Sequence, residues 1–311
     1  RANDKGVKEE INNILQKMEA GNTEESRLSR ELSEKCVRAQ YETAFAYSIY
    51  HDVLMWESDI VKSKLLEAAL KQAQEKGAIE KVEEGEYKGC IVLDLEKAKG
   101  MAKEFENPKE KYKVLVRSNG VATYAMKDFA FHMWKFGMLD PGFRFELFEK
   151  QPNGKPLYTS SDKGKVMQFG KARKVVNIID MSQNHEQATV RALINLTSPN
   201  SGNELVHVAY GVVKLAKGTL SGREGGWLGE KRNYTADDLL EEAIKKTEEK
   251  TRQSKKLGSD EEMKETAKLV ALAAIKFEYL KVSPEKEIVF SWDNALNLEA
   301  NSGPYVLYTC A

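Results

Sequence analysis

The sequence contains few of the residues that build disulfide frameworks and metal sites. Its 311 residues include three cysteines, Cys36, Cys90 and Cys310, and four histidines, all widely separated. No Cys-x-x-Cys pair occurs, and no histidine lies three to five residues from another histidine or a cysteine. An odd number of scattered thiols argues against a disulfide framework and is typical of a reducing compartment. The spacing also argues against a structural zinc site.

An excess of charge of one sign and long apolar segments are also absent. Lys plus Arg number 48 and Asp plus Glu number 48, so no global basic excess exists to collect phosphates, although local basic patches remain open. No segment approaches the roughly 20 apolar residues of a membrane-spanning helix. The first six residues, 1–6, lack the apolar core of a secretory signal. We therefore expect a cytoplasmic protein without a membrane partner.

The length predicts about two domains, at roughly 150 residues per domain. The sequence does not begin with Met, and we expect it to be an internal part of a longer protein. Residues 7–20 carry apolar side chains at the 3.6-residue period of a helix. A second helix, capped by Asn22 or Thr23, is expected to run to about Met55, and a third to end before Gly77.

The middle third alternates between strand and helix patterns, which predicts an α/β fold with a parallel sheet. Strands or helices are expected at 90–93, 95–107, 112–116, 123–135, 143–148, 175–180, 185–196 and 205–215. A polar loop is expected at 151–165 and a glycine-rich loop at 218–229. The last third, from Thr235 onward, is helical again.

Tyr124 and Asp128 form the first candidate constellation. They follow a strand and an Asn-Gly turn, and their spacing places both side chains on one face near the start of a helix. A carboxylate there can pair bidentately with a guanidinium, and a tyrosine hydroxyl can orient an amine or a carboxylate. The alternative is a capped helix with a buried tyrosine.

Two further constellations lie in the middle of the chain. Residues 180–185, Asp-Met-Ser-Gln-Asn-His, directly follow an apolar strand, where open α/β sheets bind ligands. The alternative is an ordinary loop with a helix cap. Residues 218–226 contain four glycines together with Ser221 and Arg223, which could contact phosphate, although a surface loop is the alternative. The signatures of P-loop, hydrolase, zincin and dinucleotide-binding proteins are absent.

Taken in order, these segments resemble class I arginyl-tRNA synthetases over most of the chain. The stretch from Arg117 to Asp128 is similar to the family's arginine-pocket motif, Arg-Ser-Asp-Gly-x-x-x-Tyr-x-x-x-Asp. The stretches from Tyr124 to Asp128 and from Pro304 to Tyr308 are the most specific. The other similar segments are 3–6, 56–59, 180–183, 207–211 and 289–293.

The resemblance implies activation of arginine with ATP, accompanied by Mg²⁺, and transfer of arginine to the 3′ end of its tRNA. It implies that Tyr124, Asp128 and Gln183 bind arginine. A carboxylate and neutral polar groups are also what a guanidinium requires. Residues of the ATP-binding region and its signature loop would be His207, Ser221 and Arg223.

The sequence departs from the family pattern in two places. The signature loop, 219–223, lacks both lysines of the usual KMSKS motif, and the HIGH motif is not present, so no catalytic residue is assigned. These departures favour the alternative of a non-catalytic, synthetase-derived module that binds RNA or protein.

The resemblance also implies a fold and a domain organisation. We expect the second half of a Rossmann-like parallel sheet with a mainly helical insertion and a helical C-terminal segment. The insertion and the start of the catalytic core would span 1–110, and the nucleotide-binding part 111–234. Residues 235–311 would lead into an anticodon-binding domain.

Overall fold

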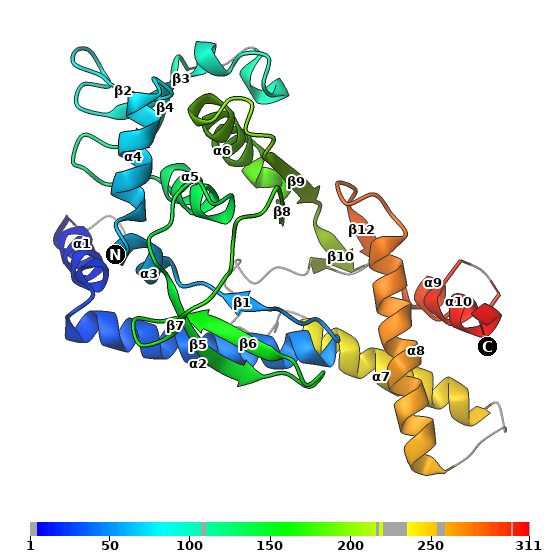
Figure 1. The fold of residues 1–311 in the computed structure, drawn as a ribbon. Helices are drawn as coiled ribbons and strands as arrows, with labels where there is room; N and C mark the ends of the chain where they lie inside the picture. Colours follow the sequence, from blue (N-terminus) through cyan, green and yellow to red (C-terminus); the bar gives the residue numbers. More distant parts are fainter. Residues whose placement is uncertain are drawn as a thin grey trace. The chain divides into compact units, whose positions relative to one another are not determined.

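The computed structural model describes residues 5–106, 110–215, 218–219, 235–253, 259–299 and 301–310, and it shows a mixed α/β chain (Figure 1). Its internal contacts divide into two units. The first comprises Arg1–Asn177 and Ser182–His207, and the second Ile178–Met181 and Val208–Ala311. No helix among the described residues is long and apolar enough to cross a membrane.

The first unit begins with two helices, α1 (Lys5–Ala20) and α2 (Glu24–Ala46). Thr23 caps α2 as expected, through reciprocal hydrogen bonds with Ser26. The expected extension of α2 to Met55 is wrong. The helix ends at Ala46, because Ser48 adopts a left-handed backbone with φ of 54° and the side chain of Gln151 bonds both backbone groups of His51.

The third expected helix is interrupted once. It consists of α3 (Glu57–Lys62) and α4 (Leu65–Glu75), separated by Lys64 with φ of 58°. The hydroxyl of Ser63 donates to the carbonyl of Ile60 and accepts from the amide of Leu65. At this break, hydrogen bonds of the Ser63 side chain therefore take the place of helical backbone hydrogen bonds.

Two small sheets belong to the first unit. One is antiparallel, with order β2-β3-β4, and consists of β2 (Glu80–Lys81), β3 (Ile91–Asp94) and β4 (Tyr112–Val116). The other has order β1-β6-β5-β7 and consists of β1 (Val53–Leu54), β5 (Arg144–Lys150), β6 (Pro156–Ser160) and β7 (Lys165–Val166). Its β1–β6 pair is parallel and its other pairs are antiparallel.

Two expectations for the connecting segments are wrong. The expected helix over 95–107 is two 3₁₀ turns, η1 (Leu95–Ala98) and η2 (Lys103–Phe105), separated by Gly100 with φ of 79°. The expected polar loop over 151–165 contains β6, because Leu157 is fully buried and supplies the core contact of a strand.

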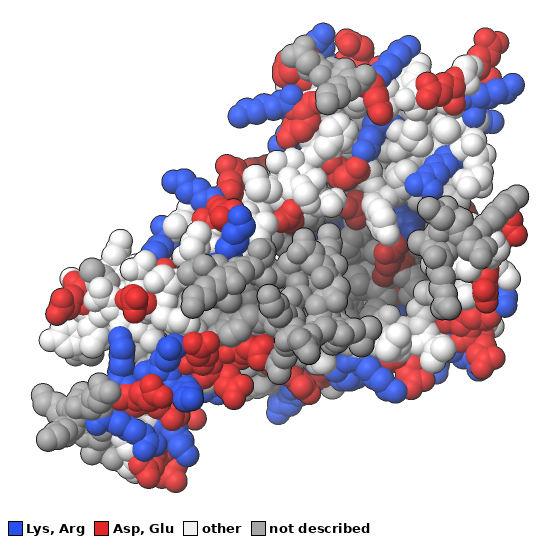
Figure 2. All heavy atoms as spheres, turned by 180° about the vertical axis from the view of Figure 1, so that it is seen from behind, with Lys and Arg blue, Asp and Glu red and all other residues white. Residues whose placement is uncertain are grey.

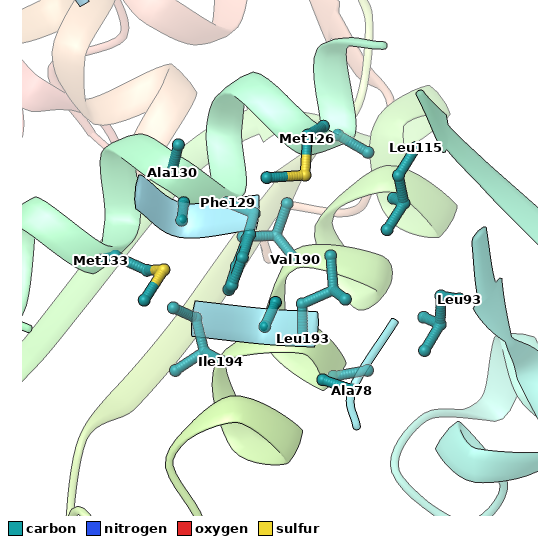
Figure 3. Packing of buried hydrophobic residues seen from close by; sticks show 14 of the residues in the cluster. Ala78, Leu93, Leu115, Met126, Phe129, Ala130, Met133, Val190, Leu193 and Ile194 are labelled. Carbon is teal, nitrogen blue, oxygen red and sulfur yellow. The ribbon is translucent and has the colours of Figure 1, made fainter. Parts of the chain in front are cut away.

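Helices α5 (Tyr124–Lys135) and α6 (Asn184–Thr197) pack side by side and form the centre of the core (Figure 1). Met126, Phe129 and Met133 on α5 lie close to apolar side chains of α6 (Figure 3). Both helices match the expected ranges. Each follows a strand, so the core fixes the strand–helix junctions that carry the candidate site.

The strand expected at 175–180 is present as β8 (Lys174–Asp180) and pairs with β9 (Glu204–Tyr210). The expectation that it is buried is wrong within the described residues, since the side chains of Val176 and Ile178 are 48% and 69% exposed. A 3₁₀ turn, η3 (Met181–Gln183), connects β8 to α6. The division between the two units runs through β8 and β9.

The described part of the second unit contains a small sheet and four helices. Strand β10 (Val213–Leu215) pairs in parallel with β12 (Ile288–Phe290) and antiparallel with β11 (Gly218–Thr219). The helices are α7 (Ala236–Gln253), α8 (Asp260–Leu280), α9 (Trp292–Ala295) and α10 (Gly303–Cys310). The expected single strand over 205–215 is split into β9 and β10 by the backbone around Gly211, whose amide bonds the carbonyl of Pro284.

Candidate functional site

Tyr124 is the first residue of α5 and projects from the junction between β4 and that helix. The turn at Asn119 and Gly120 closes as expected, with Gly120 at φ of 83°. The hydroxyl of Thr123 donates to the carbonyl of Leu115 at 3.0 Å, which ties the start of the helix to the strand. The side chain of Tyr124 is 76% exposed. The alternative of a buried tyrosine is therefore wrong, and the ring is available to a ligand.

Asp128 lies one helical turn further along α5 and is half-buried. Burial raises the pKa of its carboxyl above the ordinary value. The charge of Lys135 opposes this shift in pKa, whereas the carboxylates of Glu57 and Glu186 add to it. A partly desolvated carboxylate is stabilised by a cationic ligand, and a guanidinium is such a cation.

A buried chain of polar groups lies behind Asp128. The imidazole of His132 is 3% exposed, and its Nδ1 is 2.7 Å from the carbonyl oxygen of Asp128. Its Nε2 is 2.9 Å from the amide nitrogen of Asn177, which also donates to Gln187 at 2.7 Å. This chain fits a neutral imidazole that donates through Nδ1 and accepts at Nε2. Burial lowers the pKa of His132 to about 4, in agreement with the neutral form.

Gln183 ends η3 and forms the exposed N-cap of α6, without a side-chain capping bond. Glu186, one turn further along, contributes to the pKa of Asp128 and forms an ion pair with Lys113. The start of α6 and Asp128 therefore lie within electrostatic reach of each other. His207 is half-buried in β9.

Two of the expected site residues, Ser221 and Arg223, lie outside the described residues. In the ranges that the structure describes, no cluster of three His, Cys, Asp or Glu side chains could hold a metal ion.

A cleft of about 790 Å³ opens beside Tyr124 within the first unit. The sequence did not predict it, because its walls come from α1, α2, α3 and the β4–α5 junction, which are distant in the chain. Glu57 and Glu186 also escaped prediction as neighbours of Asp128. Each lies more than fifty residues from it in the sequence, so no local spacing could reveal its electrostatic effect on the pKa of Asp128.

The matches to known proteins, together with the mixed α/β fold, place the chain among the class I tRNA synthetases. Residues 142–292 match the family model described as the catalytic domain of class I tRNA synthetases (R). Within that class, the chain belongs to the arginyl-tRNA synthetases. It is 38% identical to arginine–tRNA ligase of Pyrococcus abyssi over 306 residues, which cover 98% of this chain and 46% of that protein.

Other relatives agree with this assignment. Arginine–tRNA ligase of Thermus thermophilus is 36% identical over 97% of this chain and 47% of its own length. The solved arginyl-tRNA synthetase of Thermus thermophilus superposes with a TM-score of 0.77 and 35% identity, covering 90% of this chain and 44% of that one. The Plasmodium falciparum structure, at 17% identity and a TM-score of 0.60, shares the fold. The chain spans about half the length of the curated relatives that it matches.

Proposed function

We propose that this chain provides the arginine-binding part of an arginyl-tRNA synthetase, which activates arginine with ATP and transfers it to the 3′ end of its tRNA. The observation that carries the proposal is the position of Asp128 and Tyr124 at the start of α5. One side chain offers a partly buried carboxylate, and the other offers an exposed aromatic hydroxyl one turn away. This pair suits a ligand with a guanidinium at one end.

Gln183 completes the arginine site in this proposal. It stands at the exposed end of α6, the helix whose Glu186 influences Asp128. A neutral amide can donate to the carboxylate of the amino acid or accept from its ammonium without adding charge. Asp128 would then hold the guanidinium and Tyr124 would orient the rest of the molecule.

ATP is the second substrate in the proposal, and His207, Ser221 and Arg223 are proposed to bind it. Formation of the adenylate depends mainly on positioning the arginine carboxylate for attack on phosphorus and on stabilising charge there. Mg²⁺ would accompany the ATP phosphates. Such an ion is held largely by phosphates and water, which fits the absence of a three-ligand cluster among the described residues.

The proposal includes the domain organisation and the compartment. An insertion and the start of the core would occupy 1–110, the nucleotide-binding part 111–234, and the approach to an anticodon-binding domain 235–311. The cytoplasm is proposed as the compartment because all three cysteines are free thiols, as expected in a reducing environment.

Arginine titration of the Asp128→Asn variant tests the arginine site. The substitution keeps the size of the side chain and removes its charge, so we expect arginine to bind at least about 100-fold more weakly, the equivalent of about 2.8 kcal/mol. Asp162→Asn, at an exposed position in the loop after β6, is the matched control and should leave the affinity unchanged. Equal arginine affinity in all three proteins would refute the site.

A further inference from the structure

Three buried polar side chains, His132, Asn177 and Gln187, form a network that joins α5 to α6. His132 follows Asp128 by four residues on α5, and Gln187 follows Gln183 by four residues at the start of α6. Each therefore lies about one helical turn behind a proposed arginine-binding residue. Asn177, on β8, bonds both of them. The polar network thus connects the two elements that carry opposite ends of the arginine site, and all of it belongs to the first unit.

The network uses both N–H groups of the Asn177 amide. The amide nitrogen, Nδ2, lies 2.9 Å from Nε2 of His132 and 2.7 Å from Oε1 of Gln187. The two N–H bonds of an amide point in fixed directions, so the two acceptors are held at a defined angle to each other. Nδ1 of His132 is 2.7 Å from the backbone oxygen of Asp128, which extends the network to a binding residue itself.

The network holds the helices and does not reach a ligand. The side chains of His132, Asn177 and Gln187 are 3%, 8% and 4% exposed. Gln183, by contrast, is exposed at the end of η3. The network can therefore act on a bound amino acid only through the residues that it positions.

Apolar packing alone does not fix the separation of two helices to the same precision. Phe129 and Met133 of α5 lie close to Val190 of α6 (Figure 3), and such contacts are non-directional. Hydrogen bonds weaken steeply away from their preferred distance and angle. The apolar contacts therefore supply stability, whereas the polar network sets the separation of α5 and α6.

The network is uncharged, which suits its place beside Asp128. Burial lowers the pKa of His132 to about 4, so the imidazole is neutral at pH 7. Charged side chains of both signs are interspersed over the described surface of the face shown in Figure 2, whereas the network in the interior contains none. A cation in its place would pair with the Asp128 carboxylate and compete with a guanidinium. A neutral network positions Asp128 and leaves its charge for the ligand.

We propose that the polar network fixes the spacing between Asp128 and Gln183, so that His132, Asn177 and Gln187 are positioning residues that select the length of the amino-acid substrate. The inference rests on the proposed function, in which Asp128 holds the guanidinium and Gln183 contacts the amino-acid end. Homoarginine has one more methylene group than arginine. It can satisfy both residues only if α5 and α6 separate, and the network opposes that movement.

The test removes the hydrogen bonds of the network and keeps the volume of the interior. The network variant combines His132→Phe, Asn177→Leu and Gln187→Met, because replacing every partner by an apolar group of similar shape preserves stability better than removing one. Gln187→Met alone is a milder second variant. The control, Thr189→Val, removes a buried hydroxyl whose bond to the carbonyl of His185 lies within α6. Thermal unfolding shows whether each variant is folded.

Calorimetric titration of the full chain compares arginine, homoarginine and propylguanidine, which is the arginine side chain without its amino-acid end. The unaltered protein and Thr189→Val should bind arginine about ten-fold or more tightly than homoarginine, since one methylene group in a fitted site is worth at least that much. This ratio should fall most of the way to equality in the network variant and part of the way in Gln187→Met. Propylguanidine should bind all of these proteins equally, because it reaches Asp128 and not Gln183.

Several results would overturn the inference. The full ratio could persist in the network variant and in Gln187→Met, or Thr189→Val could lose it to the same extent. A parallel loss of affinity for all three ligands would show general damage to the site and no selection by length. An unaltered protein that binds arginine and homoarginine equally would leave nothing for the network to select. If the network variant does not fold, Gln187→Met alone decides.

Failure of this inference and failure of the proposed function give different results. If Asp128→Asn loses arginine while the network variant keeps the full ratio, the arginine site stands and only the positioning role is overturned. If the unaltered protein binds neither arginine nor propylguanidine, the proposed arginine site fails, and the positioning role fails with it.

Discussion

His132 is the residue with the most definite consequence for the pH dependence of stability. Its pKa is lowered to about 4 from an ordinary value of 6.5, mainly by burial. Between these two values the unfolded chain binds the proton more tightly than the folded one. The stabilising contribution of the neutral imidazole is therefore complete above pH 6.5 and is lost as the pH falls toward 4. The loss amounts to about 3 kcal/mol.

Urea denaturation between pH 7 and pH 4 measures this effect in the unaltered protein and in His132→Gln. Between pH 7 and pH 4, the free energy of unfolding should decrease less in the variant than in the unaltered protein, because glutamine does not titrate. His51→Gln, at an exposed histidine, is the control and should keep the steep dependence of the unaltered protein. A variant at position 132 with the same pH dependence as the unaltered protein would show that His132 does not titrate as a buried group.

Asp128 predicts a pH dependence of arginine binding. Its pKa is raised by burial, and only the ionised carboxylate pairs with a guanidinium. Arginine affinity should therefore be constant well above that pKa and fall as the pH decreases through it. The decrease should begin at a higher pH than for an exposed aspartate with a pKa near 3.9. Calorimetric titration at a series of pH values measures it, and an affinity independent of pH down to 4 would contradict the assignment.

At the scale of elements, the packing of α5 against α6 determines where the site residues stand. Phe129 is fully buried between the two helices, so Phe129→Ala should lower the free energy of unfolding by about 3–5 kcal/mol. Ile11→Ala, at a side chain that is 50% exposed, should change the same quantity by less than about 0.5 kcal/mol. Chemical denaturation measures both values. If Phe129→Ala and Ile11→Ala lower the free energy of unfolding by similar amounts, the α5–α6 contact is not the core.

Elements with a continuous apolar face could be predicted from the sequence, and their interruptions could not. The sequence predicted α5, α6 and α8, and each of these helices buries apolar side chains. The 3.6-residue period also predicted α1, although its Ile11, Ile14 and Leu15 are exposed. The breaks at Ser48 and Lys64 escaped prediction because left-handed serine and lysine are unusual. The end of α2 also depends on Gln151, about a hundred residues away, which no local pattern reveals.

At the scale of the whole molecule, the sequence predicted the local part of the candidate site and missed its surroundings. The spacing of Tyr124 and Asp128 follows from helix geometry and needs no tertiary knowledge. The positions of Glu57 and Glu186 near Asp128, and the cleft beside Tyr124, depend on the packing of α1, α2, α3, α5 and α6. Sequence patterns therefore identified which side chains could bind arginine, whereas the structure was needed to show the charge around them.

The central claim is that Asp128 recognises the guanidinium, and comparison of arginine with citrulline tests it most directly. Citrulline has the same length but carries a neutral urea group in place of the guanidinium. Isothermal titration of the unaltered protein should show at least about 100-fold tighter binding of arginine, and Asp128→Asn should remove most of that difference. Retention of the full preference for arginine in Asp128→Asn would contradict the account.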